Sequence, residues 1–134
     1  MDSHEEAALA LMQLQDALAG QYASLSRHKM RLMVKLQNGP VSVSELAERL
    51  NISSPAVSQM IDKLANEGYV RRESLGDDQR VVGVSLTEAG AAALVEALDA
   101  FRRRVDLILA PLDKRERDTF ITLLMKIAEV TRGE

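Results

Sequence analysis

The stretch that decides the fold is residues 41–86, which read VSVSELAERLNISSPAVSQMIDKLANEGYVRRESLGDDQRVVGVSL. Leu46, Ala47 and Leu50 share one face of a short helix for which Ser44 is the expected N-cap. Asn51 follows at the corner. It suits this position because asparagine tolerates a left-handed backbone better than most residues. Ile52 is expected to pack into that corner. The pattern predicts a short helix followed by a tight turn.

A second helix is predicted directly after the turn. Ser53 or Ser54 caps it, and Pro55 falls in its first turn, where a missing N–H costs little. Gly68 ends it. The buried stripe recurs at helical spacing and consists of Val57, Met60, Ile61 and Leu64.

A β-hairpin is predicted next. Tyr69–Glu73 and Val81–Leu86 are rich in β-branched residues, and the segment Leu75–Gln79 makes the turn between them. Asp78 and Arg80 are two residues apart, which puts both side chains on one side of an extended segment. The carboxylate can therefore hold the guanidinium in one direction. The alternative is a surface ion pair that closes the hairpin and stabilises it little.

The combined pattern resembles the MarR family of winged helix-turn-helix transcriptional regulators. The resemblance rests on the run SELAERLNISSPAVSQMIDKLANEGYVRR, the DDQR of the hairpin, the SLTEAG after it and the helices at both ends. It implies a mainly α fold with a small β-hairpin wing, and a homodimer that binds a pseudo-palindromic operator in double-stranded DNA. It also implies a small amphipathic or phenolic effector between the DNA-binding lobe and the dimer helices.

The expected DNA contacts follow from this placement. The resemblance implies that the second helix enters the major groove. It also implies that Arg80 of the hairpin, directed by Asp78, enters the minor groove. Gln59 stands where many members of the family carry Arg, and glutamine can bond adenine through two atoms. An ordinary solvated helix face is the alternative. The candidate residues on the second helix are Ser53, Ser54, Pro55, Ser58, Gln59 and Lys63.

The charge is unevenly distributed along a chain whose net charge is −3. Residues 1–20 carry four acids and no bases, whereas residues 21–40 carry four bases and no acids. Arg27, Arg31 and Lys35 share one helix face, so these three and Arg72 are the candidate contacts to the DNA backbone. A solvated face is again the alternative. Because few phosphates would be neutralised, we expect binding to depend weakly on salt.

The flanking segments, residues 5–25 and 87–132, are interpreted as dimerisation helices around a lobe at 41–86, all within one MarR-like domain, 1–134. Thr87 is the expected cap of a long helix that Pro111 stops, and Asp113 with Glu116 forms a capping box for the last helix. The alternative is that the apolar faces of these helices complete the core of a monomer. The first helix is expected to present Leu11, Leu14, Leu18, Tyr22 and Leu25 on one face.

No enzyme chemistry is indicated. The sequence lacks a phosphate-binding glycine loop, a GxSxG elbow and an HExxH pair, so no cofactor is expected. Cysteine is absent, and His4 and His28 lack acids at ligand spacing, so no metal site is expected. Tyr22 and His28 are the candidate effector-pocket residues. A membrane-spanning run and a signal peptide are both missing, which favours a cytoplasmic protein without a membrane partner.

Two other functions stay open. The acidic winged segment, with five bases and seven acids, would suit a winged-helix module for protein–protein interaction. An effector-independent architectural protein that binds DNA of many sequences is the second.

Overall fold

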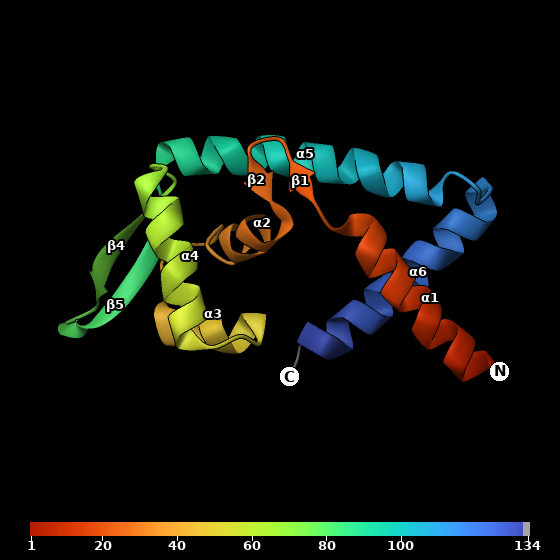
Figure 1. Ribbon diagram of the computed structural model, residues 1–134, viewed down its shortest axis with the longest axis horizontal. Helices are drawn as coiled ribbons and strands as arrows, with labels where there is room; N and C mark the ends of the chain where they lie inside the picture. Colours follow the sequence, from red (N-terminus) through yellow and green to blue (C-terminus); the bar gives the residue numbers. More distant parts are fainter. Residues whose placement is uncertain (133–134) are drawn as a thin grey trace. The chain divides into compact units, whose positions relative to one another are not determined.

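The computed structural model describes residues 1–132, except for the side chains of Asp78, Gln79 and Arg132. The chain divides into two compact units, Met1–Phe101 and Arg102–Glu134. Helices dominate the described residues, and the strands form small antiparallel sheets, which confirms the predicted fold class (Figure 1).

The first unit holds the winged helix-turn-helix. In chain order its elements are α1 (Ser3–Leu18), β1 (Gln21–Tyr22), β2 (Leu25–Ser26), α2 (Arg27–Val34), β3 (Val41–Ser42), α3 (Val43–Leu50), α4 (Ser54–Asn66), β4 (Val70–Leu75), β5 (Asp78–Leu86) and the first part of α5 (Glu88–Leu109). One sheet has the strand order β3-β5-β4, with Val41 opposite Val84 and Val70 opposite Leu86. Helix α4, the second helix of the helix-turn-helix and here called the recognition helix, lies beside the β4–β5 hairpin (Figure 1).

The core of this unit is almost entirely aliphatic. Leucine and methionine side chains of α2 and α3 meet the buried stripe of α4 and three residues of α5, Ala93, Leu94 and Ala97. The largest side chains with almost no exposed surface are Leu25, Leu32, Met33, Leu46, Val57, Ile61, Leu64 and Val84.

The prediction of one helix through residues 5–25 is wrong. Helix α1 ends at Leu18, and Gly20 and Ala23 have positive φ values of 114° and 53°, which no α-helix accommodates. Tyr22 and Leu25 instead pair in the hairpin β1–β2 and are buried in the core. No residue of α1 is buried, and its exposed apolar side chains include Leu9, Leu11, Met12 and Leu14.

The second unit contains the end of α5 and α6 (Lys114–Arg132). The predicted capping box is confirmed, because Glu116 N donates to Asp113 Oδ1 at 2.9 Å and Asp113 N donates to Glu116 Oε1 at 3.0 Å. None of its described side chains is buried. The exposed apolar residues of α6 are Ile121, Leu123, Leu124, Met125, Ile127 and Val130.

The start of α5 is fastened to the end of the recognition helix. Thr87 Oγ1 accepts from Gly90 N at 3.0 Å, as the predicted cap requires, and donates to the Gly68 carbonyl at 2.5 Å. Thr87 N donates to the Tyr69 carbonyl at 3.0 Å. A Cβ on Gly90 would lie 1.9 Å from that same carbonyl oxygen. Only glycine allows α5 to approach this backbone so closely.

Replacing Gly90 by Ala should therefore destabilise the protein, although alanine favours a helix by about 1 kcal/mol over glycine. We expect the free energy of unfolding to fall by about 2 kcal/mol or more, because the carbonyl of Tyr69 must move. Chemical denaturation measures this. The control Ala92→Gly, at an exposed position of the same helix, should cost only the propensity difference of about 1 kcal/mol. A Gly90→Ala protein more stable than the original would contradict the close approach.

Candidate nucleic-acid interface

The helix-turn-helix is set by three short-range features. Ser42 Oγ accepts from Glu45 N at 3.2 Å and caps α3, so the predicted cap at Ser44 is wrong by two residues. Asn51 has the expected left-handed backbone, with φ 55° and ψ 46°. Ser53 Oγ then accepts from Ala56 N at 3.2 Å and caps α4.

Ile52 does not hide the corner as predicted. Its side chain is 39% exposed, although its N–H donates to the Ala47 carbonyl at 3.1 Å. The corner is therefore closed by the backbone, and the isoleucine lies on the surface.

Burial determines which face of α4 is outside. Val57, Ile61 and Leu64 have no exposed surface, and Met60 is partly buried. Because an α-helix has about 3.6 residues per turn, positions four apart form strips along its surface. One exposed strip, the outer strip, consists of Pro55, Gln59 and Lys63.

A second strip, the wing-side strip, consists of Ser54, Ser58 and Asp62. Ser54 and Ser58 line a groove with residues of the wing, which is the hairpin of residues 70–86. The groove encloses about 550 Å³ and is lined by Ser42, Val43, Ser44, Ser54, Ser58, Arg72, Arg80, Val81 and Val82. Two guanidinium groups and four hydroxyl groups thus border a channel between the helix and the hairpin.

The wing differs from its predicted form in length. Strand β4 continues to Leu75 and β5 begins at Asp78, so the turn is shorter than the predicted Leu75–Gln79. Arg80 is exposed and lines the groove. The side chain of Asp78 lies outside the described residues, so its predicted role in directing Arg80 stays a prediction.

Arg72 makes a contact that the sequence does not reveal. Its Nη2 donates to Asp62 Oδ1 at 2.6 Å and lies 3.5 Å from the Ser58 carbonyl oxygen. The sequence predicts that Arg72 contacts the DNA backbone, but in the structure its guanidinium points toward the recognition helix. The charge pattern gave no signal of this pairing, because Asp62 and Arg72 lie on different elements.

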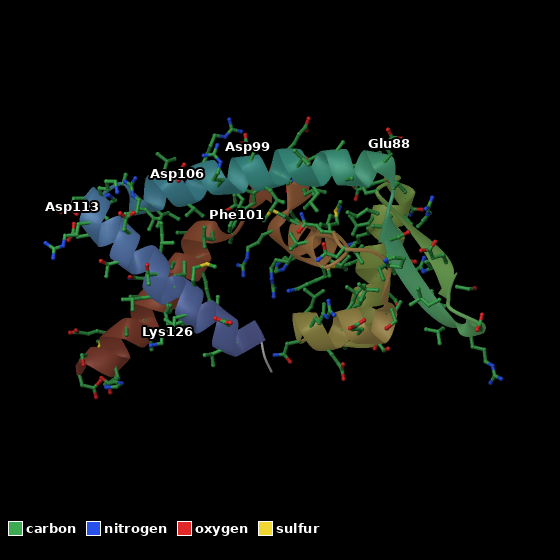
Figure 2. All side chains as sticks on the ribbon, turned by 180° about the vertical axis from the view of Figure 1, so that it is seen from behind. Glu88, Asp99, Phe101, Asp106, Asp113 and Lys126 are labelled. Carbon is green, nitrogen blue, oxygen red and sulfur yellow. The ribbon has the colours of Figure 1, made fainter. Side chains whose placement is uncertain are left out.

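The other three cations predicted to contact the DNA backbone line a second cavity, the basic pocket. Arg27, Arg31 and Lys35 border about 340 Å³ together with apolar side chains. Figure 2 shows Phe101 on the side of α5 that faces α2. The remaining lining residues are Gln15, Leu18, Met30, Val34 and Leu98.

The two predicted effector-pocket residues do not line this pocket. Tyr22 is buried, its hydroxyl donates to the Leu18 carbonyl at 2.5 Å, and its ring meets Phe101 edge to face at 5.1 Å. Tyr22 therefore supports Phe101 from the core side. His28 is exposed on α2. Phe101, one of two phenylalanines in the chain, is the pocket residue that sequence reasoning missed.

Among the described side chains, no group of three His, Asp or Glu lies close enough together to hold a metal ion. Within residues 1–132, no helix has both the length and the apolar character that a membrane span needs.

Residues 25–82, which run from β2 through the helix-turn-helix into strand β5 of the wing, match the family model of the MarR family. Over these residues the chain is similar to the MarR family. Helices α1, α5 and α6 lie outside the matched residues.

Curated relatives of this chain include two repressors of Bacillus subtilis. It is 27% identical over 108 residues to the transcriptional repressor YetL, a match that covers 78% of this chain and 65% of the relative. The match to the repressor MdtR is 29% identical and covers 73% of this chain and 63% of that protein. The chain thus spans slightly under two thirds of the length of these two repressors.

Solved structures agree with the fold. A probable transcriptional regulator from Pseudomonas aeruginosa is 27% identical, with a TM-score of 0.75 over 90% of this chain and 95% of that one. An E. coli MarR mutant complexed with operator DNA has a TM-score of 0.73 at 23% identity, over 95% of this chain and 99% of that chain.

Proposed function

We propose that this chain is a MarR-family transcriptional repressor that binds a pseudo-palindromic DNA operator as a homodimer. The observation that carries the proposal is the outer strip of α4, which presents Gln59 and Lys63 on the surface. Three fully buried residues hold it in one orientation beside a wing with an exposed Arg80. The repressors among its relatives support the direction of control.

The outer strip suits a major groove. Gln59 lies at its centre and can bond an adenine edge through two atoms, while Lys63 lies one turn further along, where a phosphate is the nearer partner. Arg80 on the wing suits a narrow minor groove, whose negative potential attracts guanidinium groups. The acidic charge of the chain, −3 overall, leaves little non-specific attraction to DNA.

A second copy of the chain would cover the exposed apolar faces. Helix α1 buries none of its residues, and α6 exposes six large apolar side chains, of which Val130 is 67% exposed. Exposed stripes of this kind mark an interaction surface. A two-fold dimer gives two recognition helices, and an inverted repeat is the DNA that matches them. Such a repressor acts in the cytoplasm, where we place it.

The basic pocket supports the proposal that the repressor responds to a small amphipathic effector. The pocket is lined by three cations together with the apolar side chains of Phe101, Leu98 and Met30, a combination that suits a compact aromatic or aliphatic anion. A ligand there would contact α1, α2 and α5 at once. We expect it to change the spacing of the recognition helices, which must match major-groove faces about 34–36 Å apart.

Selection of DNA from a random duplex pool tests the proposed function. The purified protein should enrich an inverted repeat with half-sites about one helical turn apart. Equal binding to all sequences would indicate an architectural protein, and no binding at all would indicate a protein–protein module. Either result would contradict the proposed repressor.

Arg80→Ala should weaken binding to the selected repeat by about 1–3 kcal/mol, as for one lost base contact. Titration of labelled duplex, followed by fluorescence anisotropy, measures the change. Arg49→Ala is a control on α3, because Arg49 pairs with Glu45 in its own helix at 2.7 Å. Equal effects of the two substitutions would show that Arg80 acts only through its charge.

Benzoate should bind the basic pocket, and benzamide, its uncharged analogue, should bind at least about ten-fold more weakly because it lacks a charge-assisted bond. Arg31→Gln should remove most of that preference. Isothermal titration of both compounds measures it, and operator release by benzoate tests the response. Equal affinity for the two compounds would contradict an anion site.

A further inference from the structure

The wing and the recognition helix are joined by a polar contact on the DNA side of the fold. Arg72 lies in the middle of β4, opposite Val84 of β5, and its Nη2 donates to Asp62 Oδ1 at 2.6 Å. The same nitrogen lies 3.5 Å from the Ser58 carbonyl oxygen, one helical turn earlier. The guanidinium therefore spans the wing-side strip of α4.

The buried apolar part of the wing ends at the level of this pair. Val70 and Val84 are buried in the core, but Val81 and Val82 are 38% and 42% exposed. Toward the turn at Gly76, the described side chains of the hairpin are exposed or only half-buried. The position of this outer part relative to α4 is thus defined by contacts such as the Arg72–Asp62 pair.

We propose that Arg72 is a positioning residue that fastens the wing to the recognition helix through Asp62, so that Gln59 and Arg80 meet DNA as one rigid unit. This inference rests on the proposed function and assigns Arg72 a role other than the predicted phosphate contact. Rigid placement favours binding because less conformational freedom is lost when the wing meets the minor groove.

The two roles of Arg72 predict opposite effects at Asp62. If Arg72 were a phosphate contact, Asp62 would compete with DNA for it, and removing Asp62 would strengthen binding. If Arg72 is a positioning residue, removing either Arg72 or Asp62 lets the wing move relative to α4 and weakens DNA binding. Both side chains are partly exposed, at 40% and 63%, so the effect is limited to about two- to five-fold, the range of surface ion pairs.

The experiment uses the whole 134-residue chain and the inverted repeat selected from the random pool. Asp62→Ala and Arg72→Ala should each weaken binding by about two- to five-fold, and the double variant should be no weaker than the worse single one. The slope of affinity against salt should stay the same. Arg71→Ala is the matched control, because Arg71 is an exposed cation on the opposite face of the same strand.

A second arm combines these changes with Arg80→Ala. Once the wing no longer meets DNA, its freedom no longer matters, so Asp62→Ala should have no further effect in the Arg80→Ala background. Unchanged thermal unfolding of each variant would show that the fold is intact.

Three results would overturn the inference. They are tighter binding by Asp62→Ala, a salt slope reduced by about one with Arg72→Ala alone, or equal losses with Arg71→Ala and Arg72→Ala. Each presupposes that a repeat was selected, so failure of the inference is distinct from failure of the proposed function, in which no repeat is enriched.

Discussion

The constraint on which the rest depends is the rotation of α4 about its own axis. Val57, Ile61 and Leu64 have no exposed surface, so the helix cannot turn without exposing apolar area to water. A shift of one residue would rotate the outer strip by about 100°. The buried stripe therefore determines that Gln59 and Lys63 face outward, and the function of the molecule follows from that orientation.

The neighbouring elements hold this orientation from both ends. The left-handed Asn51 and the Ser53 cap define where α4 begins, and Gly68 with Thr87 joins its end to α5. The wing lies alongside through β4. Because the basic pocket is lined in part by α2 and α5, the proposed ligand would contact two elements that share a core with α4. That shared core would connect the pocket to the recognition helix.

Sequence reasoning predicted what local chemistry encodes and missed what tertiary contacts decide. Asn51, Ser53 and Pro55 specify the turn within a few residues, and the capping box of α6 is equally local. Tyr22 and Leu25 continue the helical spacing of α1, yet positive φ at Gly20 breaks the helix, and spacing alone cannot separate these cases. The sequence likewise shows that Arg27 and Arg31 share a face. It does not show that this face borders Phe101, or that Arg72 reaches Asp62.

The most direct measurement compares the DNA motifs that the original protein and Gln59→Ala select from the same random pool. If the buried stripe of α4 presents Gln59 to the major groove, one symmetric position in each half-site should lose its base preference, while the other positions and the half-site spacing stay unchanged. An identical motif for the two proteins would show that the outer strip does not read the bases, and would contradict the orientation of α4 as the basis of recognition.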